Sequence, residues 1–481
     1  MPNTAILWFR RDLRLDDNPA LHGCLSDCDH LLPLYIHEPE EEAPWVPGAA
    51  SRWWLHGSLA QLAHDLRSRG SQLLVTRGDS LDTLTRIASA TGARTLHWNR
   101  LYDPATRERD TRVKQALRAA GIKVVSHPGS VLFEPWEIAS GSGEPYRVFS
   151  AFWRRCGTRL GECTTLDAPV SLPPAPPLVS GLALDELMLR PRIPWDSGLQ
   201  ATWTPGEAAA HARARTFLHT HAADYRQQRD RPDRTGTSAL SPALHFGELS
   251  PRRLLRMVTE IWEDPSAEPI EPFVRELGWR EFAHHLLYHY PHTTDAPLDP
   301  RFAALPWRET DAERLLEAWQ RGATGIPLVD AGMRELWELG WMHNRTRMVV
   351  ASFLTKNLRL PWQLGARWFW DTLVDADLAA NTLGWQWSAG CGADAAPYFR
   401  IFNPVLQGER FDPRGDYVRR WCPELGRLPV KFIHRPWMAP PAVLDHAGLR
   451  LGREYPAPIV DLQDSRAAAL AAYETIKGRA R

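Results

Sequence analysis

Hydrophobic and polar positions divide this chain of 481 residues into two regions with different patterns. Up to about residue 130, short apolar runs alternate with amphipathic segments, as buried strands alternate with helices in α/β proteins. The predicted strands are 5–9, 31–36, 72–76, 95–98 and 123–126. The predicted helices include 51–69, 80–90 and 104–120. This alternation predicts a doubly wound parallel sheet.

Helical periodicity replaces this alternation after residue 205. The predicted helices there include 208–220, 251–261, 273–288, 312–319, 329–339 and 345–357. Between the two regions, residues 165–205 contain eight prolines and little periodic hydrophobicity, which is typical of an extended connector. We therefore predict a Rossmann-like α/β domain over 1–130, a linker over 131–204 and an all-helical domain over 205–481.

Composition narrows the classes of function. Lys+Arg and Asp+Glu both total 57, so the net charge is zero and any nucleic-acid site must be a local basic patch. Six cysteines without a Cys-x-x-Cys pair argue against a zinc site and a disulfide framework, and favour the cytoplasm. No window approaches the roughly 18 apolar residues of a membrane span, and no leader is recognisable at the N-terminus.

Tryptophan is unusually frequent, with 22 in the chain and ten between Trp279 and Trp387. The stretch 375–387 adds an acid and an amide to two of them, because Asp377, Asn381 and Trp385 are spaced four apart. On a helix they would share one face, which suits a pocket wall better than a surface. The simpler interpretation is a core helix whose acids pair with arginine.

The stretch 375–387 also resembles the flavin-binding segment of the photolyase/cryptochrome family. The likeness extends to four further motifs, at 8–14, 235–242, 341–348 and 394–404. It implies a helical FAD-binding domain and a light-driven enzyme that splits cyclobutane pyrimidine dimers in DNA. The rivals are a blue-light photoreceptor of the same fold without repair activity, and a helical DNA-binding protein whose tryptophans only fill the core.

The resemblance implies a set of residues that bind FAD. They are Tyr225, Thr237, Ser238, Ala239, Leu240, Ser241, Trp341, Asn344, Arg347, Asp375, Ala376, Asp377 and Asn381. Ser241 precedes Pro242 as an N-cap would, and hydroxyls at a helix start suit a phosphate. From these residues alone simple capping is the better explanation, and the resemblance reverses that order. We expect Arg347 to pair with Asp375, because a buried carboxylate is costly without a guanidinium.

Four residues are implied to act on the lesion: Glu276, Asn344, Met348 and Asn381. In the family, Glu276 would hydrogen-bond a thymine carbonyl, whereas on physics alone a surface pair with Arg280 is the commoner explanation. Met348 favours cyclobutane dimers, because the (6-4) photolyases and animal cryptochromes have histidine there. Asn381 would face flavin N5, where plant-type cryptochromes have aspartate.

The resemblance also implies contacts with UV-damaged DNA whose dimer is flipped out of the helix. These contacts are Arg229, Glu276, Trp279, Arg280, Asn344, Arg345, Trp387 and Gln407. Trp385, Trp362 and Trp307 match a chain of indoles that carries electrons to the flavin. The spacing from Trp307 to Trp319 is two residues longer than in the family pattern, so Trp368 or Trp370 remains an alternative branch.

A second, light-harvesting chromophore is left open. Folate-binding relatives carry Asn-Glu where this chain has Ala105 and Thr106, so methenyltetrahydrofolate in another pose, a deazaflavin, or no antenna are all possible. No Gly-x-Gly-x-x-Gly or Walker loop is present, so dinucleotide and triphosphate binding are not supported. We predict that segment 10–14 is an ion-paired strand end rather than an active site. Histidines 284, 285, 289 and 292 are predicted to form a polar helix face and no metal site. We expect a monomer that does not bind membranes.

Overall fold

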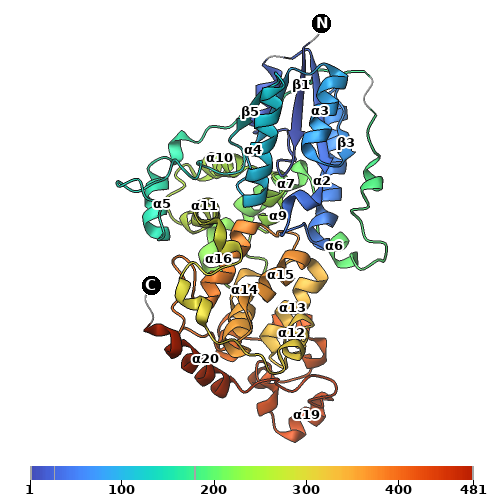
Figure 1. Ribbon diagram of the computed structural model, residues 1–481. Coiled ribbons are helices and arrows are strands. Elements are labelled where there is room, and N and C mark those ends of the chain that lie inside the picture. Colours follow the sequence, from blue (N-terminus) through green and yellow to red (C-terminus); the bar gives the residue numbers. More distant parts are fainter. Residues whose placement is uncertain (1–2, 27, 178–179, 479–481) are drawn as a thin grey trace.

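The first domain is built on a five-stranded sheet. The computed structural model describes residues 3–26, 28–177 and 180–478, so the last three residues of the predicted helical domain lie outside it. The strands are β1 (Thr4–Phe9), β2 (His30–His37), β3 (Leu74–Arg77), β4 (Thr95–Asn99) and β5 (Lys123–His127). All pair in parallel in the order β3-β2-β1-β4-β5, which confirms the predicted sheet (Figure 1).

Helices cover both faces of this sheet. Leu7 and Phe9 of β1 pack with α1 (Pro19–Leu25) and α2 (Ala49–Ser68) in one core. The intervening residues Ile6 and Trp8 pack with α3 (Ser80–Thr91) and α4 (Pro104–Ala119) in another. Because side chains alternate along a strand, one apolar run supplies both cores. The prediction of a doubly wound sheet is therefore confirmed.

The second half of the chain is helical, as predicted. Its helices are α7 (Glu207–Thr220), α8 (Tyr225–Gln228), α9 (Ser241–His245), α10 (Pro251–Trp262), α11 (Glu271–His289), α12 (Ala312–Gln320), α13 (Pro327–Leu339), α14 (Asn344–Ser352), α15 (Trp362–Thr372), α16 (Leu378–Ala389), α17 (Pro404–Phe411), α18 (Asp416–Trp421), α19 (Pro441–Ala447) and α20 (Leu462–Lys477). The predicted helix 345–357 divides into α14 and a π-helical turn, Phe353–Asn357. A π-turn changes the helical register, which periodicity in sequence does not reveal.

The segment between the halves is only partly extended. It contains α5 (Phe149–Gly157) and α6 (Ser197–Thr202), and α5 lies beside α11 (Figure 1). The proline-rich part follows the edge of the sheet, where the amide of Leu182 donates to the carbonyl of Val75 at 2.8 Å. The segment therefore packs on both halves rather than only joining them.

Glu248, which is fully buried, forms hydrogen bonds that link the two halves. Its Oε1 accepts hydrogen bonds from Trp54 Nε1 at 3.0 Å, from the amide of Gly206 at 2.6 Å and from the Ser58 hydroxyl. Burial raises the pKa of Glu248 to about 7, and these hydrogen bonds limit the rise. The folded protein therefore retains a proton on this carboxyl well above its ordinary pKa of 4.5.

A pH-dependent stability follows from Glu248. Because the folded pKa is raised, its contribution to the free energy of unfolding is present below the ordinary pKa and is lost as pH rises through the folded value. This carboxyl contributes up to one proton to the difference in proton binding between the folded and unfolded states. We expect Glu248→Gln to remove that contribution, which changes the slope of the free energy of unfolding against pH by up to roughly 1.4 kcal/mol per pH unit. Urea unfolding between about pH 5 and about pH 7 measures the slope. The control is Glu309→Gln, at an exposed position, and parallel slopes in wild type and Glu248→Gln would contradict the expectation.

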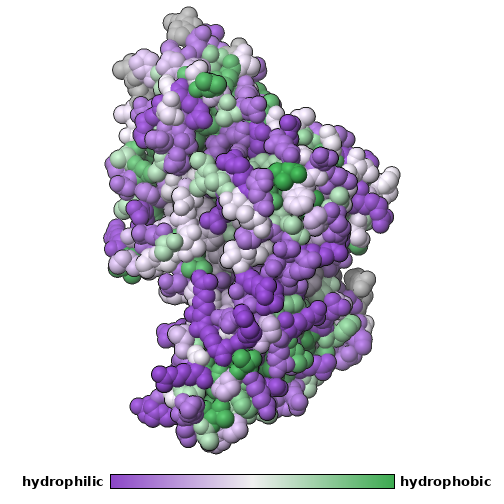
Figure 2. Space-filling model, turned by 180° about the vertical axis from the view of Figure 1, so that it is seen from behind, coloured by the Kyte–Doolittle hydropathy of each residue, from purple (hydrophilic) through white to green (hydrophobic). Residues whose placement is uncertain are grey.

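The face of the molecule seen from behind is mainly polar (Figure 2). Seen from behind, hydrophilic colour covers most of the molecule and the apolar areas are small and separate (Figure 2). Across the described residues, the helices are each too short or too polar to cross a bilayer. Most large apolar side chains instead pack in the cores of the two halves and in the contact between the halves.

Candidate functional site

Helix α16 stands at the centre of the helical half, with α11, α14 and α15 packed around it (Figure 1). It begins at Leu378, and Asp377 is its N-cap, accepting the amide of Ala380 at 2.9 Å. Asp377 therefore precedes the helix that was predicted to contain it. Asn381 and Trp385 still lie one turn apart on α16, the first half-buried and the second buried.

Asp375 is held by two partners beside the start of α16. Arg347 Nη2 lies 2.9 and 3.1 Å from its two carboxylate oxygens, so the expected ion pair is present. The Ser241 hydroxyl donates to the same carboxylate at 2.6 Å. The side chain of Asp375 is 3% exposed and that of Arg347 is 23% exposed. A largely buried charge with these partners forms a rigid polar wall.

Ser241 differs from its expected role as an N-cap. Helix α9 starts at Ser241 itself, Leu240 is the cap residue, and no side chain caps the helix. The serine hydroxyl is turned to Asp375 instead, a tertiary partner that local sequence cannot specify. Before it, Thr237, Ser238 and Ala239 are half-buried, and Ala239 has a left-handed φ of +49°.

A second charged pair links α11 to the segment after α8. Arg229 Nη1 lies 2.6 Å from Glu276 Oε1, and the Arg229 guanidinium lies over the ring of Tyr225 at 5.4 Å. Burial raises the pKa of Glu276, although Arg229 opposes that rise. Glu276 therefore pairs with Arg229 and not with Arg280, the partner that helical spacing alone suggests.

The other residues expected at the lesion are not core residues. Trp279, Met348 and Trp387 are half-buried, and Asn344 is exposed. Arg345 pairs with Asp230 at 2.7 Å and lies over the ring of Phe411 at 4.3 Å, on α17. Within the described residues, Arg345 Nε and Gln407 Oε1 are buried without a hydrogen-bond partner. Such atoms suit a site that a polar ligand completes.

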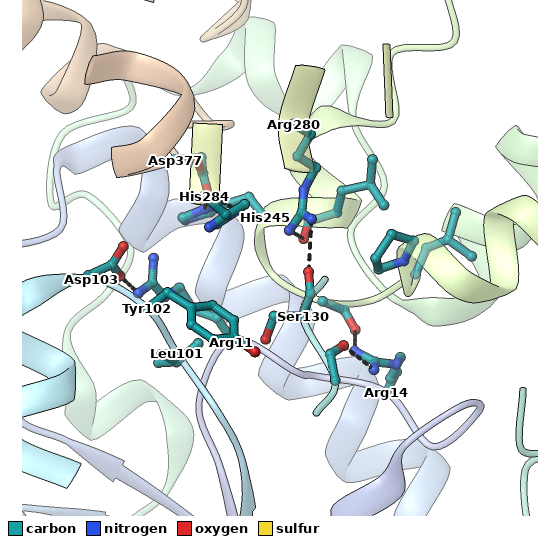
Figure 3. A pocket seen from close by; sticks show the side chains of 15 residues that line it. Arg11, Arg14, Leu101, Tyr102, Asp103, Ser130, His245, Arg280, His284 and Asp377 are labelled. Carbon is teal, nitrogen blue, oxygen red and sulfur yellow. Dashed lines mark hydrogen bonds and ion pairs between the residues drawn. The ribbon is translucent and has the colours of Figure 1, made fainter. Parts of the chain in front are cut away.

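Arg280 and Asp377 face a different place, a cavity between the two halves (Figure 3). Arg280 Nη1 donates to the carbonyl of Ser130 at 2.8 Å. Asp377 Oδ2 lies 3.5 Å from His245 Nδ1 and 3.6 Å from His284 Nε2. The structure therefore does not bring these two side chains together with Glu276 and Asp375. His245 is not among the residues that the family resemblance implies, although it lies only three residues after the motif 235–242 and shares α9 with Ser241.

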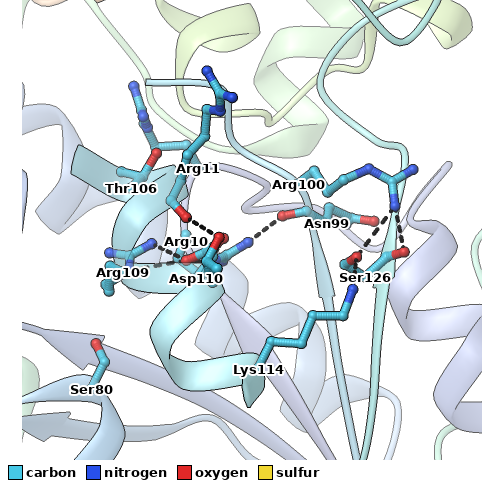
Figure 4. Close-up of polar contacts among 12 residues, drawn as sticks. Arg10, Arg11, Ser80, Asn99, Arg100, Thr106, Arg109, Asp110, Lys114 and Ser126 are labelled. Carbon is cyan, nitrogen blue, oxygen red and sulfur yellow. Dashed lines mark hydrogen bonds and ion pairs between the residues drawn. The ribbon is translucent and has the colours of Figure 1, made fainter. Parts of the chain in front are cut away.

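The carboxyl ends of β1 and β4 adjoin this cavity, where the strand order reverses. Arg10 Nη1 lies 3.0 Å from both oxygens of Asp110, and Arg109 Nη2 lies 2.9 Å from one of them (Figure 4). Segment 10–14 is thus an ion-paired strand end, as predicted. Thr106 is fully buried and donates to the carbonyl of Asp103 at 2.9 Å, so its hydroxyl is already used.

Tryptophans of the expected electron chain lie in the large core of the helical half. Trp385 contacts Phe369 at a ring-centroid distance of 5.0 Å and Trp319 at 6.1 Å. Trp362 is buried and Trp307 is half-buried against the same core. Trp319, fully buried beside Trp385, is a neighbour that the sequence did not assign. Its distance along the chain from Trp385 concealed the contact.

The predicted polar helix face is wrong: His284 and His285 are buried within the packing of α11, and His292 lies beyond the end of that helix. Two of these histidines bond the backbone. His285 Nδ1 and His289 Nε2 lie 3.2 and 3.1 Å from the carbonyl of Pro135. Elsewhere, Asp16, Glu207 and His211 bring one potential metal-ligand atom each within 4.8 Å of one another. Arg253 already pairs with both oxygens of Asp16, at 2.6 and 2.7 Å, so we assign that cluster to the domain contact.

Asn381 offers a test of the central wall. Its Nδ2 donates to the carbonyl of Ala366 at 3.0 Å, a bond that a charged aspartate cannot make. In Asn381→Asp we expect the added anion to lower the midpoint potential of bound flavin by about 50 mV and to change the pH dependence of that potential from the wild-type one. Redox titration measures both. Asn403→Asp, a change at the N-cap of α17, is the control, and equal potentials in Asn381→Asp and wild type would contradict the placement.

Comparison with known proteins agrees with this architecture. Residues 5–175 match the family model described as DNA photolyase, and residues 273–475 match the FAD binding domain of DNA photolyase. The chain is 45% identical to a deoxyribodipyrimidine photo-lyase of Agrobacterium fabrum over 98% of both chains. It is 42% identical to cryptochrome-1 of Arabidopsis thaliana over 96% of this chain and 69% of that one.

A solved structure is similar throughout. A bacterial class III photolyase from Agrobacterium tumefaciens matches with a TM-score of 0.95 and 44% identity, over 100% of this chain and 98% of that one. The α/β domain and the helical FAD-binding domain together place the chain in a class of two-domain flavoproteins. Within that class, the chain belongs to the DNA photolyase family.

Proposed function

We propose that this protein is a deoxyribodipyrimidine photo-lyase that uses FAD and light to split cyclobutane pyrimidine dimers in DNA. The observation that carries the proposal is the grouping of Arg347, Asp375 and Ser241 beside the start of α16, which carries Asn381. The relatives named deoxyribodipyrimidine photo-lyase support it.

The residues present fit FAD. Thr237 and Ser238 offer hydroxyls in a half-buried loop for the diphosphate, and Asp375 with Asn381 offers hydrogen-bonding groups for the ring system. Tyr225, Trp341, Asn344 and Ala376 complete the proposed contacts. Reduced FAD, when bound, supplies under light the electron that opens the dimer and takes it back afterwards. Trp385, Trp362 and Trp307 are proposed to return the cofactor to its reduced form.

The chain's own groups bind and orient the lesion. We assign Trp279 and Trp387 to the faces of the flipped bases, because a dimer must leave the stack before a buried cofactor can reach it. Glu276, with its raised pKa, donates a hydrogen bond to a base carbonyl that gains negative charge. Arg229, Arg345 and Gln407 contact the strand around the opening. Arg280, turned to the domain contact, reaches DNA only if its bond to Ser130 is exchanged.

A blue-light photoreceptor of the cryptochrome type is the second candidate, favoured by the 42% identity to the Arabidopsis thaliana protein. Three residues favour repair instead. Asn381 stands where plant-type cryptochromes have aspartate, Met348 stands where (6-4) photolyases and animal cryptochromes have histidine, and Glu276 is proposed to hydrogen-bond the lesion.

Illumination of the reduced protein with two lesion-containing oligonucleotides tests the function. We expect restored thymines in the oligonucleotide with a cyclobutane dimer and none in the one with a (6-4) lesion. Dark incubation is the control. Flavin photoreduction without repair of either lesion would favour the photoreceptor.

Three further attributes belong to the same proposal. The protein acts on UV-damaged DNA as a monomer, and it works in the cytoplasm. For the second, antenna chromophore three alternatives stay open, namely methenyltetrahydrofolate, a deazaflavin or none. Sedimentation and absorption spectra of the purified protein test the first and the last.

A further inference from the structure

The ring of Phe149 lies flat against the indole of Trp279. Their ring centroids are 3.7 Å apart and their planes differ by 7°. Aromatic pairs left to themselves prefer offset or edge-on contacts at about 4.5–7 Å. The close parallel overlap is therefore imposed by the elements that carry the two rings, α5 and α11.

The two rings differ in exposure. Phe149 is 1% exposed, whereas Trp279 is half-buried. The buried ring thus backs an indole that still reaches the surface, and Glu276 lies one turn earlier on the same helix. The ring of Trp153 is nearly parallel to that of Phe149, with ring centroids 6.4 Å apart and planes 9° apart.

Several contacts fix α5 on α11 in one register. A Cβ at Gly278 would lie 2.6 Å from the Trp153 indole, so only glycine admits that ring. The ring centroid of Phe152 lies 5.3 Å from that of Phe282.

A further bond ties the start of α5 to a family motif. The amide of Phe149 donates to Asp394 Oδ2 at 3.3 Å. Asp394 has a left-handed φ of +48° and opens the motif 394–404, so the position of Phe149 depends on both the helix and this loop.

We propose that Phe149 is a positioning residue for lesion recognition: it fixes the plane of Trp279 so that the indole receives a flipped base. The inference rests on the proposed function and deepens it. A ring already held in its bound orientation loses less side-chain freedom when the base stacks on it, so more of the stacking free energy appears as affinity. The segment expected to be a linker thereby contributes to the DNA site.

Two substitutions on α5 test this role in the flavin-loaded protein. In Phe149→Leu we expect the Kd for an oligonucleotide with one cyclobutane dimer to rise about tenfold, because base stacking on a mobile indole is weakened. The Kd for the undamaged oligonucleotide and the repair yield per photon absorbed by the bound complex stay unchanged. Phe152→Leu removes the same atoms from a buried ring of the same helix and is expected to change the dimer Kd less than about twofold.

A double-mutant cycle tests whether Phe149 acts through Trp279. Phe149→Leu in a Trp279→Ala background is expected to add nothing to the loss of lesion affinity, whereas additive losses would contradict the proposal. In fluorotryptophan-labelled protein, the fluorine resonance missing from Trp279→Phe identifies Trp279. That resonance is expected to move in Phe149→Leu and to stay in Phe152→Leu.

The outcomes separate this inference from the proposed function. The positioning role alone is overturned if Phe149→Leu keeps the wild-type preference for the dimer. It is also overturned if Phe149→Leu and Phe152→Leu lose the same affinity for the dimer. A wild-type protein that binds damaged and undamaged oligonucleotides equally contradicts both proposals, even if the fluorine resonance moves.

Discussion

Replacement of Asp375 by asparagine is expected to leave the purified protein almost free of flavin. The substitution removes the charge that Arg347 faces at 2.9 Å and leaves a largely buried guanidinium without a counter-ion. Loss of one partner of such a pair destabilises its surroundings by about 3 kcal/mol or more. Because the pair borders the proposed cofactor, we expect its disruption to lower cofactor affinity by a comparable free energy, about a hundredfold. The flavin-to-protein ratio and FAD titration of the apoprotein measure the effect.

A surface ion pair of the same domain provides the control. Asp295 is 54% exposed and lies 3.7 Å from Arg367, so Asp295→Asn is expected to change flavin affinity by less than about 1 kcal/mol. Full flavin occupancy in Asp375→Asn, with an unchanged FAD affinity, would mean that this pair does not border the cofactor.

Removal of the Glu276 carboxyl has the second-largest expected effect, on repair rather than on cofactor binding. In Glu276→Ala the base carbonyl loses a hydrogen-bond donor and Arg229 loses the partner at 2.6 Å. We expect repair per absorbed photon to fall about tenfold. Glu276→Gln keeps a neutral donor and is expected to retain most of the activity. Glu271→Ala, which breaks a looser ion pair of the same helix at 3.5 Å, is the control.

The pH dependence of repair follows from the same carboxyl. Burial raises the pKa of Glu276, so its protonated, donating form persists to a higher pH than that of an exposed glutamate and is lost as pH rises through the raised value. We expect wild-type repair to decline across that range and Glu276→Gln to be insensitive to pH there. Identical pH profiles for the two proteins would show that this proton takes no part.

Most of the architecture was predictable because both periodicities are strong. The run from Ala5 to Phe9 is apolar at every position, as a strand buried on both faces must be, and the structure places its residues alternately in two cores. Helix α5 was not predicted, because nine residues among prolines and glycines carry too short a pattern. Its aromatic side chains pack on α11, which is far along the chain, so the local sequence did not indicate their role.

The candidate site was predictable only where partners are dictated by charge. Asp375 needed a cation, and Arg347 was the expected one. Glu276 had two arginines within reach, and helical spacing favoured Arg280, whereas tertiary packing selected Arg229. For the same reason the Ser241 hydroxyl donates to the Asp375 carboxylate instead of capping its own helix. Stacked rings such as Phe149 and Trp279 leave no periodic trace, because neither position is unusual within its own helix.

The shared packing of the two halves limits how this molecule can be taken apart or recombined. One apolar cluster runs from Trp54 on α2 through Trp203 to Phe246 and Val374 of the helical half. Cutting the chain near residue 204 would therefore expose an apolar surface on each fragment, and we expect neither fragment to be a stable, soluble domain. If the first half is exchanged between homologues, we expect a stable protein only when the helical-half residues that pack against it are exchanged as well.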